Sequence, residues 1–175
     1  MASDFYLAVE TKKGGKIKGE SISDPFKDQI QINKFTIGLN SPTDFDGQAA
    51  GRVHLEHAEF EMDTNLSSVP FFSTICTNDV IKQATLTCRK TGVTGKPVMF
   101  LQWRFTDARV VSFKMSGEND KVGDTLTLAY ASIEVWYGKQ NQDGSVSNGL
   151  VSCYDAGDNA MSDCSLPDPK PNAKS

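Results

Sequence analysis

The amino-acid sequence predicts an all-β fold, an antiparallel β-barrel of bent and bulged strands with one short α-helix that caps an end. Apolar and polar residues alternate through most of the chain between Asp4 and Tyr137, which is the period of half-buried strands. The alternation slips by one residue around Asn33, and slips again between Leu55 and Ala58, as it does where a β-bulge inserts one extra residue. Two such bulges are expected to bend long strands into a barrel.

Each expected strand is marked by apolar residues at alternate positions, and turn residues separate the strands. The first strand carries Phe5, Leu7 and Val9 and ends at the lysine- and glycine-rich turn of residues 12–16. The later strands are indicated by Ile30 and Ile32; Phe35, Ile37 and Leu39; Ala58, Phe60 and Met62; Ala84, Leu86 and Cys88; Met99, Leu101, Trp103 and Phe105; Val111, Phe113 and Met115; and a last long strand over residues 125–137.

Residues 66–76 interrupt the alternation and are predicted to form the single short helix. Serines precede the segment's apolar residues, Pro70 lies in its first turn, and Phe72, Ile75 and Cys76 recur at helical spacing. We expect the helix to plug an open end of the barrel.

A chain of 175 residues is expected to fold as one domain. We predict that this domain spans residues 1–155. Residues 156–175 are small, polar and rich in proline, and they predict a flexible C-terminal tail.

The cysteines bear on the compartment in which the protein works. They are Cys76, Cys88, Cys153 and Cys164, and no two of them form a C-x-x-C pair, so a structural zinc site is not expected. The first ten residues lack the basic and apolar regions of a secretory signal, so the default interpretation is four reduced thiols. The alternative is a disulfide between Cys153 and Cys164, which would close a small loop in the tail.

The charge of the chain argues against several partners. The net charge is −4, whereas a protein that binds nucleic acid needs a basic face to neutralise phosphates. No segment is long and apolar enough to predict a span of the bilayer. We therefore expect neither nucleic-acid binding nor membrane insertion.

The residues that commonly carry catalysis do not form a recognisable pattern. His54 and His57 are the two histidines, and on a strand they project to opposite faces unless a bulge realigns them, so an interface edge is favoured over a metal site. Residues 92–97 are similar to the end of a phosphate-binding loop, but Pro97 occupies the place of the magnesium-binding hydroxyl, which favours a hairpin turn. We expect no enzymatic activity, no cofactor and no metal.

The last long strand carries apolar residues on both faces, and so does the strand that begins at residue 98. Antiparallel sheets usually keep one face polar and wet, so a second apolar face needs a cover. A second subunit is the favoured cover, and the alternative is that loops or the tail cover this face. The predicted subunit-interface residues are Leu126, Leu128, Tyr130, Val98 and Phe100.

Charged residues of both signs gather in separate parts of the chain. Residues 12–18 are rich in lysine, and the acidic positions are Asp24, Asp28, Asp44 and Asp46. One interpretation is an ordinary solvated surface, and the other is complementary charge between stacked copies. On the second interpretation Lys16, Lys18 and Asp24 are predicted stacking contacts.

Several segments in order resemble one family. They are residues 4–7, residues 17–21, Ser41-Pro42 opening a long loop that closes at residues 51–53, the helical segment 68–76, the strand over 84–90, residues 110–112 and 126–130, and Asp143-Gly144-Ser145 with Tyr154-Asp155. Their order and spacing over residues 3–156 resemble the Hcp tube proteins of bacterial type VI secretion systems.

The resemblance implies a structural subunit that forms hexameric rings with a wide lumen. The rings would stack into a tube inside a contractile sheath, and the tube and spike would be expelled with small effector proteins in the lumen. The protein would be made in the bacterial cytoplasm and secreted without a signal peptide. The loop over residues 41–51 is expected to hold neighbouring rings, which makes Pro42, Phe45 and Asp46 predicted assembly contacts. The alternative function is a monomeric, lectin-like β-sandwich that binds a ligand.

Overall fold

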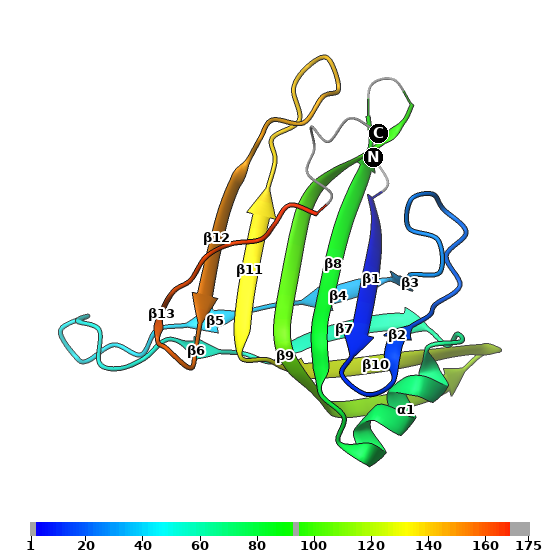
Figure 1. Ribbon diagram of the computed structural model, residues 1–175, viewed down its shortest axis with the longest axis horizontal. Coiled ribbons are helices and arrows are strands. Elements are labelled where there is room, and N and C mark those ends of the chain that lie inside the picture. Colours follow the sequence, from blue (N-terminus) through cyan, green and yellow to red (C-terminus); the bar gives the residue numbers. More distant parts are fainter. Residues whose placement is uncertain (1–2, 93–94, 169–175) are drawn as a thin grey trace.

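The computed structural model describes residues 3–92 and 95–168, and the strands and helix of this part are all labelled in sequence order (Figure 1). The elements are β1 (Ser3–Thr11), β2 (Gly15–Ile17), β3 (Ile30–Ile32), β4 (Lys34–Thr36), β5 (Leu39–Asn40), β6 (His54–Leu55), β7 (Ala58–Asp63), α1 (Ser68–Thr77), β8 (Ile81–Thr91), β9 (Pro97–Glu118), β10 (Lys121–Ala129), β11 (Ser132–Tyr137), β12 (Leu150–Asp155) and β13 (Ala160–Met161). All the strand pairs are antiparallel, so the predicted all-β class with one short helix is confirmed for the described residues.

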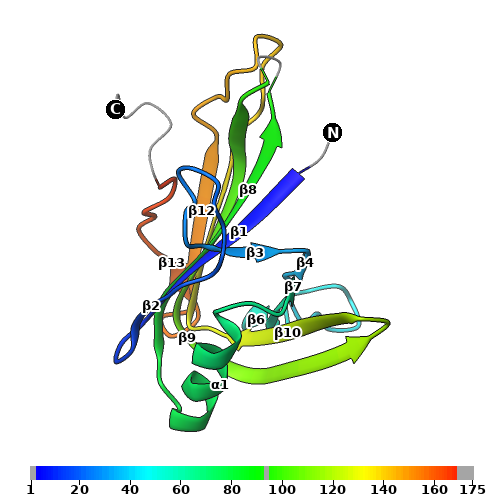
Figure 2. The same cartoon turned by 90° about the vertical axis from the view of Figure 1, so that its right-hand side faces the viewer.

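Eleven strands are hydrogen-bonded into one sheet, and β5 and β6 form a separate pair. The 22-residue strand β9 divides this sheet into two halves, because it pairs with β8 and β11 up to Ala108 and with β10 from Arg109 onward. We call the half that contains β13, β12, β11, β8, β1, β2 and β3 the upper sheet. We call the half that contains β10, β7 and β4 the lower sheet. Figures 1 and 2 show the two halves at a steep angle to each other.

The bend in β9 corrects the sequence-based division of this region. Residues 99–105 and 111–115 were expected to lie on separate strands, but they belong to the one strand β9. Asp107 takes a left-handed conformation with φ 49°, which aspartate tolerates better than most residues. As a result Phe105 and Ala108, which lie three positions apart, are both fully buried.

The expected barrel is not closed by a continuous ladder. Next to β1 the pairing ends at β3, and next to β7 it ends at β4. Asn33 separates these two short strands, and its backbone N–H donates to the Glu61 carbonyl oxygen at 2.8 Å. The slip that the sequence shows at Asn33 is therefore the point where the chain passes from the upper sheet to the lower sheet.

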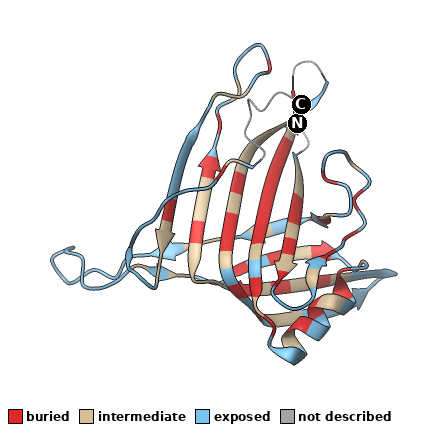
Figure 3. Cartoon of the chain, in the orientation of Figure 1, coloured by how far each residue is buried: buried red, intermediate tan, exposed pale blue. Residues whose placement is uncertain are grey.

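The hydrophobic core fills the angle between the two halves. It is built from alternate residues of the facing strands, but along β8 the residues on both faces are buried from Ala84 to Arg89 (Figure 3). The fully buried core members include Leu7, Ile30, Ala58, Phe60, Phe71, Ile81, Leu86, Phe105, Leu126 and Leu128. The rings of Phe60 and Phe105, one from each half, meet edge to face with centroids 6.0 Å apart.

The segment expected as one long strand over residues 125–137 is two strands. Strand β10 ends at Ala129 in the lower sheet, and β11 begins at Ser132 in the upper sheet. Leu126 and Leu128 face the core before this corner, and Ile133 faces it afterwards. The apolar residues on both faces of the segment therefore arise from a corner, and not from one strand with two covered faces.

The helix α1 occupies the predicted segment, and of the three residues that indicated it by their helical spacing only Ile75 packs against the core. Its buried residues are Ser68, Phe71 and Thr74, whereas Phe72 is 61% exposed and Cys76 is also exposed. Phe71 is fully buried and lies near Phe113 of β9, with ring centroids 6.3 Å apart. Helical spacing alone fits either set of residues, and the contact with β9 selects the Phe71 side.

Part of the predicted tail is docked on the upper sheet. Strand β13 pairs with β12, and residues 162–168, which we call the C-terminal strap, then cross β11 towards β9 (Figure 1). Leu166 of the strap is only 5% exposed. The boundary at residue 155 between a domain and a flexible tail stays a prediction, and residues 169–175 lie outside the described part.

Two adjacent phenylalanines of α1 provide a matched test of this packing. Phe71→Ala removes a fully buried ring, so we expect it to lower the free energy of unfolding by about 3–5 kcal/mol. Phe72→Ala removes an exposed ring from the same helix, and we expect a change of only about 0.5 kcal/mol. Urea unfolding monitored by tryptophan fluorescence measures both values, and equal losses would contradict the assignment of the buried face.

Candidate functional site

The loop over residues 41–51 forms a short, ordered hairpin that projects from one end of the molecule (Figure 1). Thr43 and Ala49 form an isolated antiparallel bridge, and the Ala50 N–H donates to the Pro42 carbonyl oxygen at 2.8 Å. The Asp44 carboxylate accepts hydrogen bonds from the backbone N–H groups of Asp46 at 3.1 Å and Gln48 at 2.8 Å. All of these bonds are made within the hairpin itself.

The hairpin presents the three residues that the sequence predicts as assembly contacts. Phe45 is fully exposed at 105% of its reference area, and Pro42 and Asp46 are exposed as well. A large aromatic side chain has only two rotatable side-chain bonds to immobilise on binding, and exposed aromatic residues commonly anchor protein interfaces. Asp44 and Asp46 give the same tip a negative charge.

A second feature lies at the other end of the long axis, around β2 and the loop over residues 18–29 (Figure 1). A cavity of about 580 Å³ lies between this loop and the outer face of the upper sheet. Its lining includes Lys16, Lys18 and Lys27, with Phe26 on the loop side and Gln102 on the sheet side. Lys18 has one weak ion pair, with its Nζ atom 3.8 Å from the Asp28 carboxylate.

The loop that borders the cavity is anchored by a stack of three side chains. Phe26 stacks on Tyr6 with ring centroids 5.1 Å apart, and the Arg89 guanidinium lies over both rings at 4.6 and 4.8 Å. Arg89 also donates to the Asp24 carbonyl oxygen at 3.2 Å and to the Tyr6 hydroxyl at 2.9 Å. This anchor sets the position of the exposed Asp24 and of the lysines beside it.

The structure thus brings Lys16 and Lys18 together at the cavity, whose lining also includes Pro25, the residue after Asp24. It places Pro42, Phe45 and Asp46 together on the hairpin. The hairpin tip carries Asp44 and Asp46, whereas the cavity lining carries Lys16, Lys18 and Lys27 together with the carboxylates of Glu10, Asp28 and Asp168. The hairpin and the loop over residues 18–29, which borders the cavity, project on opposite sides of the molecule (Figure 1). Their role as stacking contacts stays a prediction.

The predicted subunit-interface residues fall into two groups. The prediction that Leu126 and Leu128 lie at a subunit interface is wrong, because both side chains are fully buried in the core of this one chain and offer no surface to a partner. Val98, Phe100 and Tyr130 are half-buried, so their role as interface residues stays a prediction.

Phe100 and Tyr130 each have specific neighbours. Phe100 lies on the upper sheet beside Lys90, whose Nζ atom is 4.8 Å from the ring centroid. Tyr130 donates its hydroxyl to the Glu56 carbonyl oxygen at 2.8 Å. Burial, with a smaller effect of the nearby Glu56 charge, raises the pKa of Tyr130 to about 12, so this phenol stays protonated at neutral pH.

Several exposed apolar side chains were missed by the sequence analysis. They are Leu66, Val69 and Phe72 at α1; Val111, Met115 and Val122 on the lower sheet; and Tyr137, Leu150, Val151 and Met161 at the far edge of the upper sheet. Val111 is exposed because the pairing between β9 and β10 shifts by one residue beside it. A bulge of this kind leaves only a weak signal in the sequence, since Val111 and Phe113 still alternate as if they shared a face.

Two of the cysteines form the disulfide that the sequence analysis gave as the alternative to four reduced thiols. Cys153 and Cys164 form a disulfide with Cα atoms 5.7 Å apart, so the default of four reduced thiols is wrong for these two. Cys76 and Cys88 are free. Burial raises the pKa of the Cys88 thiol to about 12, which keeps it protonated and unreactive at neutral pH.

The sequence analysis considered the two histidines and residues 92–97 for chemistry. Both histidines are exposed, and within residues 3–92 and 95–168 no group of three or more potential ligands is arranged to hold a metal. The Gly92 N–H donates to the Lys96 carbonyl oxygen at 2.8 Å, and residues 93–94 of the expected hairpin turn lie outside the described part. In the same part of the chain no helix has the length and apolar character needed to cross a membrane.

Comparison with known families decides what kind of protein carries these surfaces. The family model described as "Type VI secretion system effector, Hcp" matches residues 6–137, which is most of the chain. The chain belongs to the Hcp family. No curated protein matches it.

Solved structures support the same fold. Hcp1 from E. coli superposes with a TM-score of 0.76 at 20% identity, covering 89% of this chain and 99% of that chain. Hcp1 from Salmonella typhimurium gives 0.73 at 24% identity, covering 92% and 99%, and Hcp3 from Pseudomonas aeruginosa gives 0.66 at 12% identity, covering 88% and 98%. At these identities the likeness establishes the Hcp fold, and the alternative of a lectin-like module has no support from these comparisons.

The hairpin of this Hcp protein can be tested for order before any assembly is studied. Asp44→Ala removes the carboxylate that accepts the Asp46 and Gln48 N–H groups, so we expect these two amides to exchange with solvent roughly 2- to 10-fold faster. Asp46→Ala, which changes the charge equally but breaks none of these bonds, is the control. Hydrogen exchange by NMR measures both, and equal exchange in the two variants would contradict a hairpin ordered by Asp44.

Proposed function

We propose that this chain is a non-enzymatic structural subunit of a type VI secretion tube, in which hexameric rings stack and are expelled with small effector proteins in the lumen. The observation that carries the proposal is the family match over residues 6–137, joined to an ordered hairpin with a fully exposed Phe45. A fully exposed phenylalanine on a projecting hairpin offers apolar area that a neighbouring subunit can bury.

Exposed apolar side chains give the subunit further surface for self-association. They lie on three separate parts of the molecule, at α1, on the lower sheet and at the edge formed by β12 and β13. Closed rings that also stack need at least two kinds of contact on each subunit, because one contact alone gives either a ring or a filament. Separate apolar patches on one chain suit this requirement.

The proposed stacking contact joins the hairpin of one copy to the lysine-bearing cavity of the next. Phe45 would enter beside Phe26, while Asp44 and Asp46 would face Lys16, Lys18 and Lys27. The hairpin and the loop over residues 18–29, which borders the cavity, project on opposite sides of the molecule (Figure 1), so the proposed contact would be head to tail and could repeat along a tube. Asp24 borders the same surface and is proposed to set the register.

The proposed contacts within a ring use the half-buried Val98, Phe100 and Tyr130. The contractile sheath, the spike and the effectors are further proposed partners. The subunit would be made in the bacterial cytoplasm and leave it with the expelled tube.

The first experiment is to measure the mass of the purified protein by light scattering coupled to size exclusion, with negative-stain images of the peak. We expect a mass about six times that of the 19.1 kDa chain and ring-shaped particles. A monomer at micromolar concentration without rings would overturn the proposal.

The stacking contact is tested by reversing charge at the cavity. Lys16→Glu with Lys18→Glu is expected to shorten stacks of rings while the rings persist. Each exposed ion pair contributes only about 0.2–1 kcal/mol, but the pairs repeat around every ring. Lys114→Glu with Lys121→Glu, which changes the charge equally on the lower sheet, is the control.

Two further variants separate the contributions to this contact. Asp46→Lys is expected to restore stacking in the Lys16 and Lys18 variant, because it reverses the sign on the hairpin side. Phe45→Ser is expected to weaken stacking by about 1–2 kcal/mol per contact. Stack lengths measured by electron microscopy that do not differ between the cavity and control variants would contradict the contact.

A further inference from the structure

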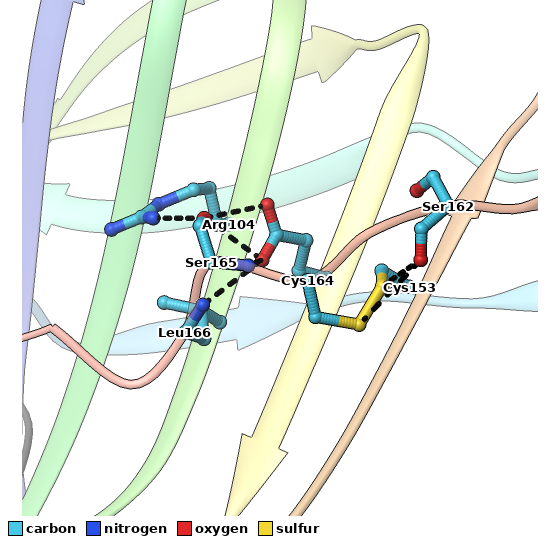
Figure 4. Close-up of a disulfide and its surroundings, with 7 residues drawn as sticks. Arg104, Cys153, Ser162, Cys164, Ser165 and Leu166 are labelled. Carbon is cyan, nitrogen blue, oxygen red and sulfur yellow. Dashed lines mark hydrogen bonds between the residues drawn. A yellow bond between two sulfur atoms is a disulfide. The ribbon is translucent and has the colours of Figure 1, made fainter.

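The C-terminal strap, residues 162–168, is a part of the molecule that the family match does not cover. The match ends at residue 137, whereas the strap follows β13 and crosses the outer face of the upper sheet. In Figure 4 the strap passes from Cys164 through Ser165 and Leu166 over the strands, with Arg104 beside Ser165. Its presence on this chain therefore needs an explanation of its own.

The strap begins at a disulfide that ties it to the sheet. Cys153 lies on β12 opposite Glu134 of β11 and is 2% exposed, whereas Cys164 is exposed. The bond links positions 11 residues apart, and it brings Cys164 to the strand next to Glu134. The disulfide therefore places Ser165, the residue after Cys164, next to Glu134, to which it binds.

Glu134 receives the first part of the strap. Its carboxylate accepts the backbone N–H groups of Ser165 at 2.7 Å and of Leu166 at 3.1 Å, and it also accepts the Ser165 hydroxyl at 2.9 Å. The side chain of Leu166 is buried at this point.

Gln102 and Arg104 of β9 receive the last part. The Gln102 side-chain amide exchanges two hydrogen bonds with the backbone of Asp168, at 2.6 and 2.9 Å. The Arg104 guanidinium donates to the Ser165 hydroxyl and lies 3.2 Å from the Asp168 carboxylate. Gln102 is 1% exposed and Arg104 is 6% exposed, so both polar side chains are buried with the strap in place.

The strap also forms part of the wall of the cavity described above. Asp168 and Gln102 both line it, together with Thr85 and Thr87 of β8. Release of the strap would therefore open the cavity on this side and uncover the polar side chains that the strap contacts.

Non-covalent contacts to the four-residue stretch 165–168 have to offset the entropy lost when that segment is ordered on the sheet. The disulfide reduces this cost, because it keeps Cys164 close to its docking place even when residues 165–168 detach. Hence the same contacts hold the strap more firmly in the oxidised chain than in the reduced one.

We propose that Cys153 and Cys164 form a redox latch, which holds the strap over Gln102, Arg104 and Glu134 when oxidised and releases it when reduced. Reduction uses two molecules of a small thiol. The first thiolate attacks the exposed sulfur of Cys164, and the electron pair of the broken bond passes to the Cys153 sulfur, which takes a proton. The second thiolate attacks the small molecule's sulfur in the mixed disulfide, which frees the Cys164 thiol and yields one small disulfide. The reverse exchange with a small disulfide closes the latch.

Hydrogen exchange on the full chain tests the latch without reference to ring formation. The amides of Ser165, Leu166 and Asp168 donate to the sheet, so reduction with a phosphine or dithiol is expected to speed their exchange by about tenfold or more. The Leu86 amide in the core of the upper sheet serves as the internal reference, and its exchange is expected to stay unchanged.

Variants make the test independent of the reductant. Cys164→Ser is expected to show fast strap exchange under oxidising and reducing conditions alike, whereas Cys76→Ser, at a free and exposed cysteine, is expected to switch like the wild type. Equal protection of the strap amides in the oxidised and reduced wild type would overturn the proposal. So would full protection in Cys164→Ser, because the non-covalent contacts would then hold the strap alone.

Discussion

The fold depends on a single constraint, which is that β9 belongs to both halves of the sheet. Its pairing changes from β8 and β11 to β10 between Ala108 and Arg109, so the two halves cannot move apart without breaking a strand. Phe105 sits just before this change and meets Phe60 of the lower sheet and Tyr130 of the corner between β10 and β11. The core is therefore closed by covalent continuity on the β9 side, and on the opposite side by the short step through Asn33.

This arrangement explains how far the sequence could be interpreted. Strand periodicity correctly indicated an all-β fold, the slip at Asn33 and the short helix, because each is a local pattern of buried and exposed positions. It failed at Asp107 and at Tyr130, where the chain turns a corner without a glycine or proline to mark it. At Asp107 one bent strand was interpreted as two strands, and at Tyr130 two strands were interpreted as one strand with two apolar faces. For this reason Leu126 and Leu128 were assigned to a surface that they do not reach.

The candidate site was predictable to a different degree in its two parts. The hairpin of residues 41–51 and the lysines of residues 16–18 are exposed and local, so their positions in the sequence were enough to single them out. The cavity between the loop over residues 18–29 and the upper sheet could not be predicted. It is lined by β1, β2, β8, β9 and the strap, which are distant from one another in sequence. The disulfide could be predicted only as a possibility. The spacing of Cys153 and Cys164 in the sequence allowed a bond, but the hairpin of β12 and β13 is what brings the two cysteines together.

The outer face of the upper sheet unites these features. Its side chains are polar, yet Thr85, Thr87, Arg89, Gln102 and Arg104 are all buried, which is unusual for the wet face of an antiparallel sheet. Two segments cover it, the loop held by Phe26 and Arg89 on one side and the strap held by Glu134 and Arg104 on the other. Each cover combines hydrogen bonds to buried polar side chains with one buried apolar side chain, Phe26 in the loop and Leu166 in the strap, and neither of these two belongs to the main core cluster. A sheet whose apolar face is fixed and whose polar face has removable covers can change its outer surface while the fold itself stays intact.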